Sequence, residues 1–181
     1  LVDLFTRHQA DHKPGSTNRI IVLVRHLFNR ALEWEVPGLT KNPSAGVPMI
    51  ANENQRQRFL SAEEAQRLMT AVEASESPML KYIVALLLLT GARRNEVLHA
   101  QWEDFDFSAR QWVIPKNKSA RPRYIPLSDA AVRLIEQVPR HPRSNYVFTN
   151  PKTGKPYKQI YYPWDTARKR AGLDGLRLHD L

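Results

Sequence analysis

Residues 80–98 read LKYIVALLLLTGARRNEVL, and this stretch indicates how the chain folds. Its first part belongs to a predicted helix at 79–90 that is apolar on nearly every side, which is typical of a helix at the centre of a core. A glycine interrupts this helix, and a second helix is predicted at 93–100. The charged Arg93 directly after a buried helix calls for an anionic partner. That partner is either a phosphate, which a guanidinium grips by two oxygens, or only Glu96 three positions further on.

The rest of the chain is mostly helical in pattern, with one pair of strands. Helices are predicted at 17–35, 61–72, 129–138 and 160–171, and strands at 111–115 and 123–127. Ser16 and Ser128 are predicted helix caps, and Ser61 with Glu64 has the pattern of a capping box. Period-two alternation joins the two strands as a hairpin. The predicted fold class is therefore mainly α with a small antiparallel β-sheet or hairpin, an α+β arrangement.

The composition narrows the class of protein. The 181 residues include 27 Lys and Arg against 18 Asp and Glu, a formal net charge of +9. This balance favours a polyanionic partner such as nucleic acid, with an inert basic surface as the alternative. The lack of cysteine excludes a disulfide scaffold, a thiolate zinc site and a cysteine nucleophile. No apolar run is long enough to span a membrane and no signal region opens the sequence, so we expect a cytoplasmic protein without a membrane partner.

Two further segments hold residues suited to a phosphodiester. The hairpin tip and the start of the second strand carry the basic residues Lys116, Lys118, Arg121 and Arg123. A lysine at such a tip reaches a phosphate or donates a proton, unless the tip is simply a solvated turn. His179 is a second candidate, although a lone histidine is more often structural. Arg94, beside Arg93, completes the set of candidate DNA-binding residues.

Together these segments resemble the tyrosine recombinases, the phage-integrase family. The family's first catalytic box reads Thr-Gly-x-Arg with an acidic residue three positions after the arginine, which corresponds to residues 90–96. Its basic hairpin ends in a Val/Ile-Pro-Leu segment, matched by residues 125–127. The family's hairpin lysine stands eight positions before that proline, at Lys118, with Lys116 as the alternative. Residues 178–181, Leu-His-Asp-Leu, are similar to the first half of the second box, His-x-x-Arg.

The resemblance implies a DNA breaking and rejoining reaction. A tyrosine attacks a DNA phosphate, forms a 3′-phosphotyrosyl link and frees a 5′-hydroxyl, and the reverse reaction joins strands. No metal or other cofactor is implied, because the covalent link retains the free energy of the phosphodiester. Arg93 would stabilise charge on the phosphate, and Lys118 would protonate the leaving 5′-oxygen. His179 would hydrogen-bond the phosphate or assist proton transfer, and Glu96 would hold Arg93 in place.

The resemblance also implies a domain organisation. Residues 1–42 are expected to be the C-terminal part of a helical core-binding domain, 43–58 a linker, and 59–181 a catalytic domain incomplete at its C-terminus. The expected second arginine would follow Leu181, and all six tyrosines precede His179, so none stands where the nucleophile should. We expect this piece to bind double-stranded DNA without cleaving it, and the full-length protein to act as a homo-tetramer on two duplexes.

Two other functions stay open at this point. A basic DNA-binding module that does not cut would explain the missing tyrosine, but it would leave Arg93, Lys118 and His179 without a role. A DNA-relaxing enzyme like the type IB topoisomerases would share the attack chemistry without strand exchange. An arginine directly after Leu181 and a tyrosine further on would favour a recombinase over a DNA-binding module. An assay of supercoil relaxation tests for the DNA-relaxing enzyme.

Overall fold

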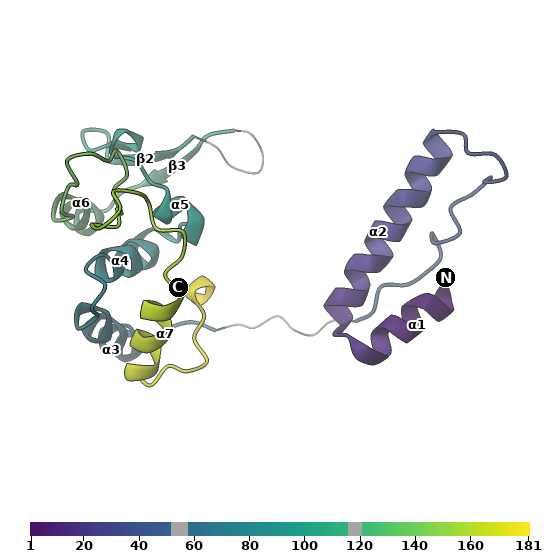
Figure 1. The fold of residues 1–181 in the computed structure, drawn as a ribbon, viewed down its shortest axis with the longest axis horizontal. Coiled ribbons are helices and arrows are strands. Elements are labelled where there is room, and N and C mark those ends of the chain that lie inside the picture. The colour runs from purple at the N-terminus through teal and green to yellow at the C-terminus, as the bar shows by residue number, and fades with distance from the viewer. Residues whose placement is uncertain (52–57, 116–120) are drawn as a thin grey trace. The chain divides into compact units, whose positions relative to one another are not determined.

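The computed structural model describes residues 1–51, 58–115 and 121–181. The chain divides into two compact units, Leu1–Gln57 and Arg58–Leu181 (Figure 1). The first unit contains α1 (Val2–Asp11) and α2 (Pro14–Glu33). These helices pack around Phe5 and Ile21, which are both buried. None of the helices in the described part of the chain is both long and apolar enough to cross a membrane.

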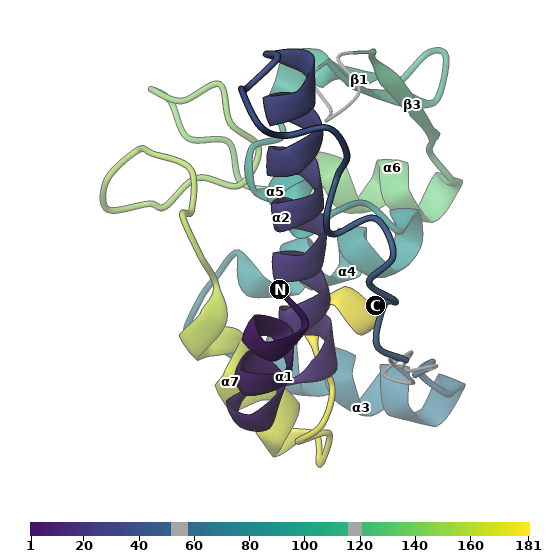
Figure 2. The same cartoon turned by 90° about the vertical axis from the view of Figure 1, so that its right-hand side faces the viewer.

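The segment after α2 runs back beside that helix (Figure 2). It is held by the side chains of two asparagines and an arginine rather than by a regular ladder. Asn18 donates to the carbonyl of Ile50 and accepts from its backbone N–H, both at 2.8 Å. Arg25 donates to the carbonyl of Val47 at 2.7 Å, and Asn42 donates to the carbonyl of Arg25 at 2.9 Å. The described part of the segment up to residue 51 therefore packs as part of the first unit.

The start of α2 differs from the prediction. Ser16 is not its cap, because the helix begins at Pro14 with Lys13 as the preceding residue. A proline fits the first turn of a helix, where its missing N–H would have no intrahelical partner and its fixed φ is already helical. The helix also ends at Glu33, slightly before the predicted end at residue 35.

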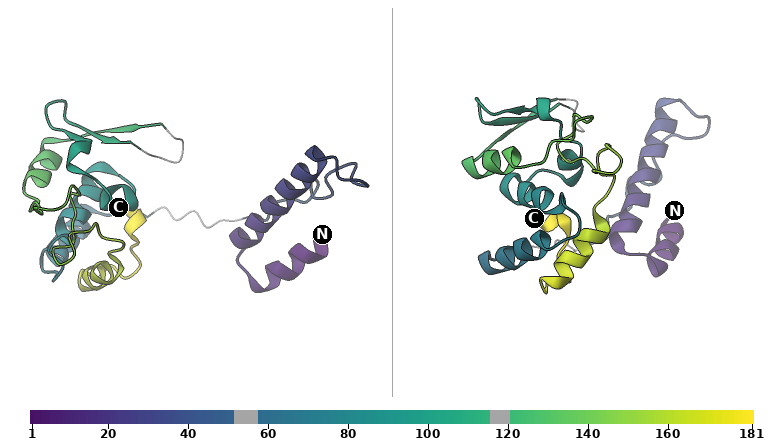
Figure 3. Two further views of the ribbon diagram at one scale, coloured as in Figure 1. Left: turned by 45° about the horizontal axis from the view of Figure 1, so that its top comes forward. Right: turned by 60° about the vertical axis from the view of Figure 1, so that its left-hand side comes forward.

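The second unit is mostly helical with one small sheet. Its elements are α3 (Ala62–Glu73), α4 (Leu80–Thr90), α5 (Arg94–Leu98), η1 (Trp102–Asp104), β1 (Phe105–Asp106), β2 (Gln111–Ile114), β3 (Arg123–Pro126), α6 (Asp129–Glu136), α7 (Tyr161–Arg170) and η2 (Leu178–Asp180). The sheet lies at one end of the unit and α3 and α7 at the other, with α4 between them (Figure 3). The predicted fold class is confirmed.

The core is built around α4, as its all-round apolar sequence predicts. Ile83, Val84 and Leu86 are fully buried. Two other helices, α3 and α6, pack directly on α4. The residues that cap them are the predicted ones: Ser61 and Glu64 form a reciprocal capping box, and the Ser128 hydroxyl accepts from the N–H at the third residue of α6. The start of α5 follows α4 closely, so the buried helix carries the segment with Arg93.

The sheet has three antiparallel strands in the order β1-β2-β3. The predicted hairpin is confirmed, with Trp112 opposite Ile125 and Ile114 opposite Arg123. The edge strand β1 was not predicted as a strand, because its two residues are too few to show a period. Its Phe105 stacks on Trp112 with ring centroids 5.2 Å apart. This packing fixes the hairpin stem against the rest of the unit.

Candidate nucleic-acid site

Small residues shape the turn between α4 and α5. The Thr90 hydroxyl donates to the carbonyl of Leu86 at 2.5 Å and accepts from the N–H of Ala92 at 3.3 Å. Gly91 ends α4 with φ +59°, a left-handed conformation that costs glycine little. Ala92 is buried, and the chain then reaches Arg93 in an extended conformation as the N-cap of α5. The helix is shorter than the predicted 93–100.

Arg93 and Glu96 form an ion pair at the start of α5. The Arg93 Nη1 atom lies 3.0 Å from Glu96 Oε1, and the backbone N–H of Arg93 donates to Glu96 Oε2 at 2.8 Å. The Arg93 side chain is 61% exposed, whereas that of Glu96 is 11% exposed. The Glu96 carboxylate therefore fixes the backbone of Arg93, while most of the Arg93 side chain still faces solvent. The ion pair between Arg93 and Glu96, one of the two alternatives predicted from the sequence, is therefore present.

The stem of the hairpin meets the same carboxylate. Arg123 Nη2 donates to Glu96 Oε2 at 2.5 Å, so Glu96 links α5 to β3. Arg121, at the end of the described part of the tip, is exposed. Lys116 and Lys118 lie outside the described residues. The stem of the hairpin is thus anchored beside Arg93 through Arg123 and Glu96.

The turn that holds His179 is fixed in a similar way. Asp180 Oδ2 accepts from the backbone N–H of Arg177 at 2.9 Å, and Asp180 Oδ1 accepts from Arg177 Nη2 at 2.9 Å. The Asp180 side chain is only 6% exposed. His179, between these two residues, is exposed. Its imidazole is therefore carried on a short turn whose backbone is tied by a carboxylate.

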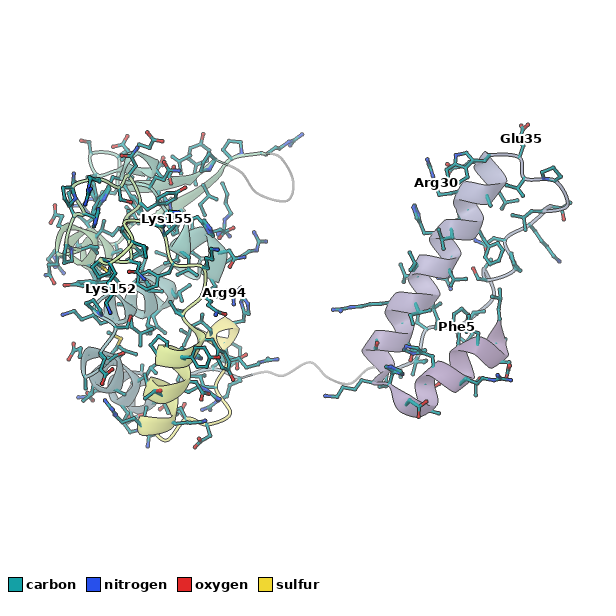
Figure 4. All side chains as sticks on the ribbon, in the orientation of Figure 1. Phe5, Arg30, Glu35, Arg94, Lys152 and Lys155 are labelled. Carbon is teal, nitrogen blue, oxygen red and sulfur yellow. The ribbon has the colours of Figure 1, made fainter. Side chains whose placement is uncertain are left out.

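A small cavity connects the two turns. Its volume is about 220 Å³, and it is lined by Arg94 from α5, Tyr161, Trp164 and Arg168 from α7, and Arg177 and Leu178 from the last turn, among others. Figure 4 shows Arg94 extending from α5 above the C-terminal turn in that view. The cavity thus brings together the residue after Arg93 and the residue before His179.

One wall of this cavity is a fixed ion-pair cluster. Arg168 pairs with Asp165 and also donates to the backbone carbonyls of Asp174 and Leu176. Hydrogen bonds from Lys169 and then from Arg168 hold the pKa of Asp165 below its ordinary value. These contacts tie α7 to the segment that leads to the last turn. Because the Arg168 guanidinium already binds Asp165 and two backbone carbonyls, its part here is to hold that segment in position.

Two of these contacts were missed at the level of the sequence. Arg177 and Asp180 repeat the three-residue spacing of Arg93 and Glu96, and that spacing was a usable signal. Arg123 stands two positions before the buried Ile125, so period-two alternation places it on the inner face of β3. Within the ranges 1–51, 58–115 and 121–181, no group of three or more His, Cys, Asp or Glu side chains could hold a metal ion.

Comparison with protein families assigns the second unit. Residues 58–181 match the model described as the phage integrase family. The chain belongs to this family. Among curated proteins, it is similar to the integrase of Salmonella phage P22, with 32% identity over 166 residues that cover 84% of this chain and 41% of that protein. The shufflon-specific DNA recombinase of Escherichia coli is 30% identical over 169 residues, which cover 92% of this chain and 42% of the relative. The chain spans about two fifths of the length of these two relatives.

Solved structures of two integrases share the fold of this chain. A lambda integrase dimer bound to a COC′ core site matches 99% of this chain and 65% of its own chain, with a TM-score of 0.75 and 16% identity. The Tn1549 transposon integrase in complex with circular intermediate DNA matches 86% of this chain and 57% of its own, with a TM-score of 0.67 and 17% identity. At these identities the likeness shows the fold alone.

Proposed function

We propose that this chain is the DNA-binding and catalytic part of a site-specific tyrosine recombinase. The observation that carries the proposal is the placement of Arg93, whose side chain is exposed and whose backbone is fixed by the nearly buried Glu96. The chain that holds this arginine belongs to the phage integrase family. Because Glu96 holds the backbone of Arg93 in place, the Arg93 guanidinium is positioned where it can stabilise negative charge that develops on a phosphorus. The relatives named as an integrase and a DNA recombinase support DNA as the substrate.

In the proposed reaction a tyrosine oxygen attacks a DNA phosphorus. The tyrosine hydroxyl gives up its proton to water as its oxygen bonds to the 3′-phosphate, the bond from phosphorus to the 5′-oxygen breaks, and the 5′-oxygen takes up a proton. Arg93 binds the non-bridging oxygens, and Lys118 supplies the proton, with Lys116 as its alternative. His179 hydrogen-bonds the phosphate or assists the proton transfer. In this proposal the attacking tyrosine is none of the six in residues 1–181, which all precede His179.

The proposed organisation follows the same assignment. Residues 1–42 supply the end of a core-binding domain, and 59–181 a catalytic domain incomplete at its C-terminus. Residues 43–58 link the two, although the part up to residue 51 packs on α2. Arg94 and Arg121 contact the DNA backbone. In this proposal four copies of the full-length protein act on two duplexes. The reaction takes place in the cytoplasm and needs no metal or other cofactor.

A suicide DNA substrate tests the catalytic part of the proposal. Such a substrate loses the fragment that carries the 5′-hydroxyl, so the covalent protein–DNA product accumulates and can be counted on a denaturing gel. In a chain extended past Leu181 to its tyrosine, we expect Arg93→Ala to abolish the covalent product while DNA binding changes only a few fold. Undiminished covalent product would remove Arg93 from the active site.

The proton donor has its own test. We expect Lys118→Ala to slow cleavage of an ordinary phosphodiester, because the leaving 5′-oxygen then has no acid. A 5′-thio leaving group needs no proton, so it should restore the rate of the variant. If the thio substrate fails to restore cleavage, Lys118 is not the acid, and the same pair of substrates is then applied to Lys116→Ala.

A further inference from the structure

We propose that Arg123 is a positioning residue for Arg93. In this proposal Arg123 keeps the Glu96 carboxylate paired, so that the Arg93 guanidinium can leave Glu96 and bind a DNA phosphate. The inference rests on the proposed function, in which Arg93 binds phosphate. It gives Arg123 a different part from the direct DNA contact expected from the sequence.

The contacts of Glu96 are divided between its two oxygens. Oε1 holds the side chain of Arg93, with Nη1 3.0 Å away. Oε2 holds the backbone N–H of Arg93 at 2.8 Å and Arg123 Nη2 at 2.5 Å. The Arg93 guanidinium can therefore swing away from Oε1 while both contacts at Oε2 stay in place. The backbone position of Arg93 does not depend on where its guanidinium points.

The burial of Glu96 makes its second partner necessary. Its side chain is 11% exposed, and removing one partner from a nearly buried ion pair leaves a charge that is costly to keep without compensation. With Arg123 in place, Glu96 keeps a cation when Arg93 turns to DNA. Without Arg123, the only guanidinium left to Glu96 among its described partners is that of Arg93. Glu96 would then compete with the DNA phosphate for Arg93.

The strand places Arg123 for this purpose. Arg123 lies opposite Ile114 and two residues before Ile125, both of which are buried, so its side chain starts on the inner face of the hairpin. Its Nε atom is covered from solvent and has no hydrogen-bond partner in the part of the chain that the structure describes. The Nη2 contact to Glu96 is thus what orients the guanidinium. Arg121, two residues earlier, is exposed and offers a matched cation on the same strand end.

The test measures how many DNA phosphates the protein of residues 1–181 contacts. Binding to a labelled duplex of about 20 base pairs is followed by fluorescence anisotropy over a range of salt, where each phosphate contact adds about 0.9 to the slope of log K against log salt. We expect Arg93→Gln to reduce this slope by about 0.9, and Arg123→Gln to reduce it by the same amount because it withdraws Arg93. The double variant should also lose about 0.9, whereas two direct contacts would together lose about 1.8.

Glu96→Gln supplies the second half of the test. A neutral amide does not compete with phosphate for Arg93, so adding Glu96→Gln to Arg123→Gln should restore the slope. Arg121→Gln, with and without Glu96→Gln, controls for the loss of one charge near the DNA, and its slope should not respond to Glu96→Gln. Arg123→Lys keeps the charge and should retain the parent slope. Melting temperatures of all variants show whether each one is folded.

The outcomes separate this inference from the function on which it rests. Additive losses in the Arg93 and Arg123 variants, or no restoration by Glu96→Gln, would make Arg123 a direct contact and overturn the inference. An Arg123→Gln slope equal to that of the parent would overturn it as well. An unchanged slope in Arg93→Gln would instead contradict the proposed function, because Arg93 would then bind no phosphate.

Discussion

An arginine and a carboxylate three residues later fix the backbone at both turns of the candidate site. In the pair Arg93 and Glu96, and again in the pair Arg177 and Asp180, the carboxylate accepts from the backbone N–H and from the guanidinium of the arginine. The two carboxylates are nearly buried, with 11% and 6% of the side chain exposed. Each device is local, so a short segment can hold a functional side chain without help from a long helix.

The left-handed glycine before Arg93 gives a first prediction at the residue scale. Gly91 has φ +59° and open space where a Cβ would stand, so Gly91→Ala adds conformational strain but no clash. We expect a loss of about 1 kcal/mol in the free energy of unfolding, measured with urea. Gly175→Ala is the control, since Gly175 also has open space but no positive φ. An equal effect of the two substitutions would contradict the assignment of strain to Gly91.

The ion pairs of Asp165 predict a dependence of stability on pH. Lys169 and then Arg168 lower the pKa of this carboxyl in the folded chain, while in the unfolded chain it titrates near its ordinary value of about 3.9. The stabilising contribution is therefore present above that value and is lost as the pH falls through the folded pKa. We expect Asp165→Asn to lower the melting temperature at neutral pH and to differ less from the parent in acid. A difference that grows on acidification would contradict this sign.

Single residues were predictable from sequence where a local rule applied. The pairing of Arg93 with Glu96 followed from their spacing, and the turn before it followed from Gly91. The contact of Arg123 with Glu96 was missed, because its charge was considered without the alternation of the strand; its predicted contact with DNA stays a prediction. Its contact with Glu96 also joins positions 27 residues apart, which no local pattern contains.

At the scale of elements, helix caps separate a correct prediction from a wrong one. Ser61 and Ser16 both had the sequence pattern of a cap, but only Ser61 accepts from the N–H three residues on, at 3.2 Å. Ser16 lies inside the first turn of α2 and is exposed. We expect Ser61→Ala to cost about 1 kcal/mol of unfolding free energy and Ser16→Ala to cost nothing. Urea unfolding of each variant measures this, and a loss at Ser16 equal to that at Ser61 would contradict it.

The predicted length of a helix was accurate where its apolar pattern and a stop signal in the sequence indicated the same end. The helix α4 starts one residue later than predicted and ends at Thr90 as predicted, since its apolar sequence and Gly91 point to the same limits. The helix α5 is shorter than its prediction, because its short sequence carries no clear stop signal. The strand β1 exists through pairing with β2, and two residues cannot reveal that from their own pattern.

At the scale of the whole molecule, charge is the property that the sequence gives directly. With a net charge of +9, the chain should bind duplex DNA mainly through phosphates, even before any base is read. We expect the dissociation constant for a short duplex to rise at least about tenfold between ~50 and ~200 mM salt, measured by fluorescence anisotropy. Affinity that is indifferent to salt would argue against a phosphate-binding surface.

We expect Arg93 and His179 to act on one and the same phosphate. Their flanking residues line one cavity, but only a bound duplex places the phosphate itself. A crystal structure of residues 1–181 with duplex DNA is the most direct measurement. We expect one backbone phosphate within about 3 Å of both the Arg93 guanidinium and the His179 imidazole. Two side chains on different phosphates, or DNA on another face of the second unit, would contradict the account.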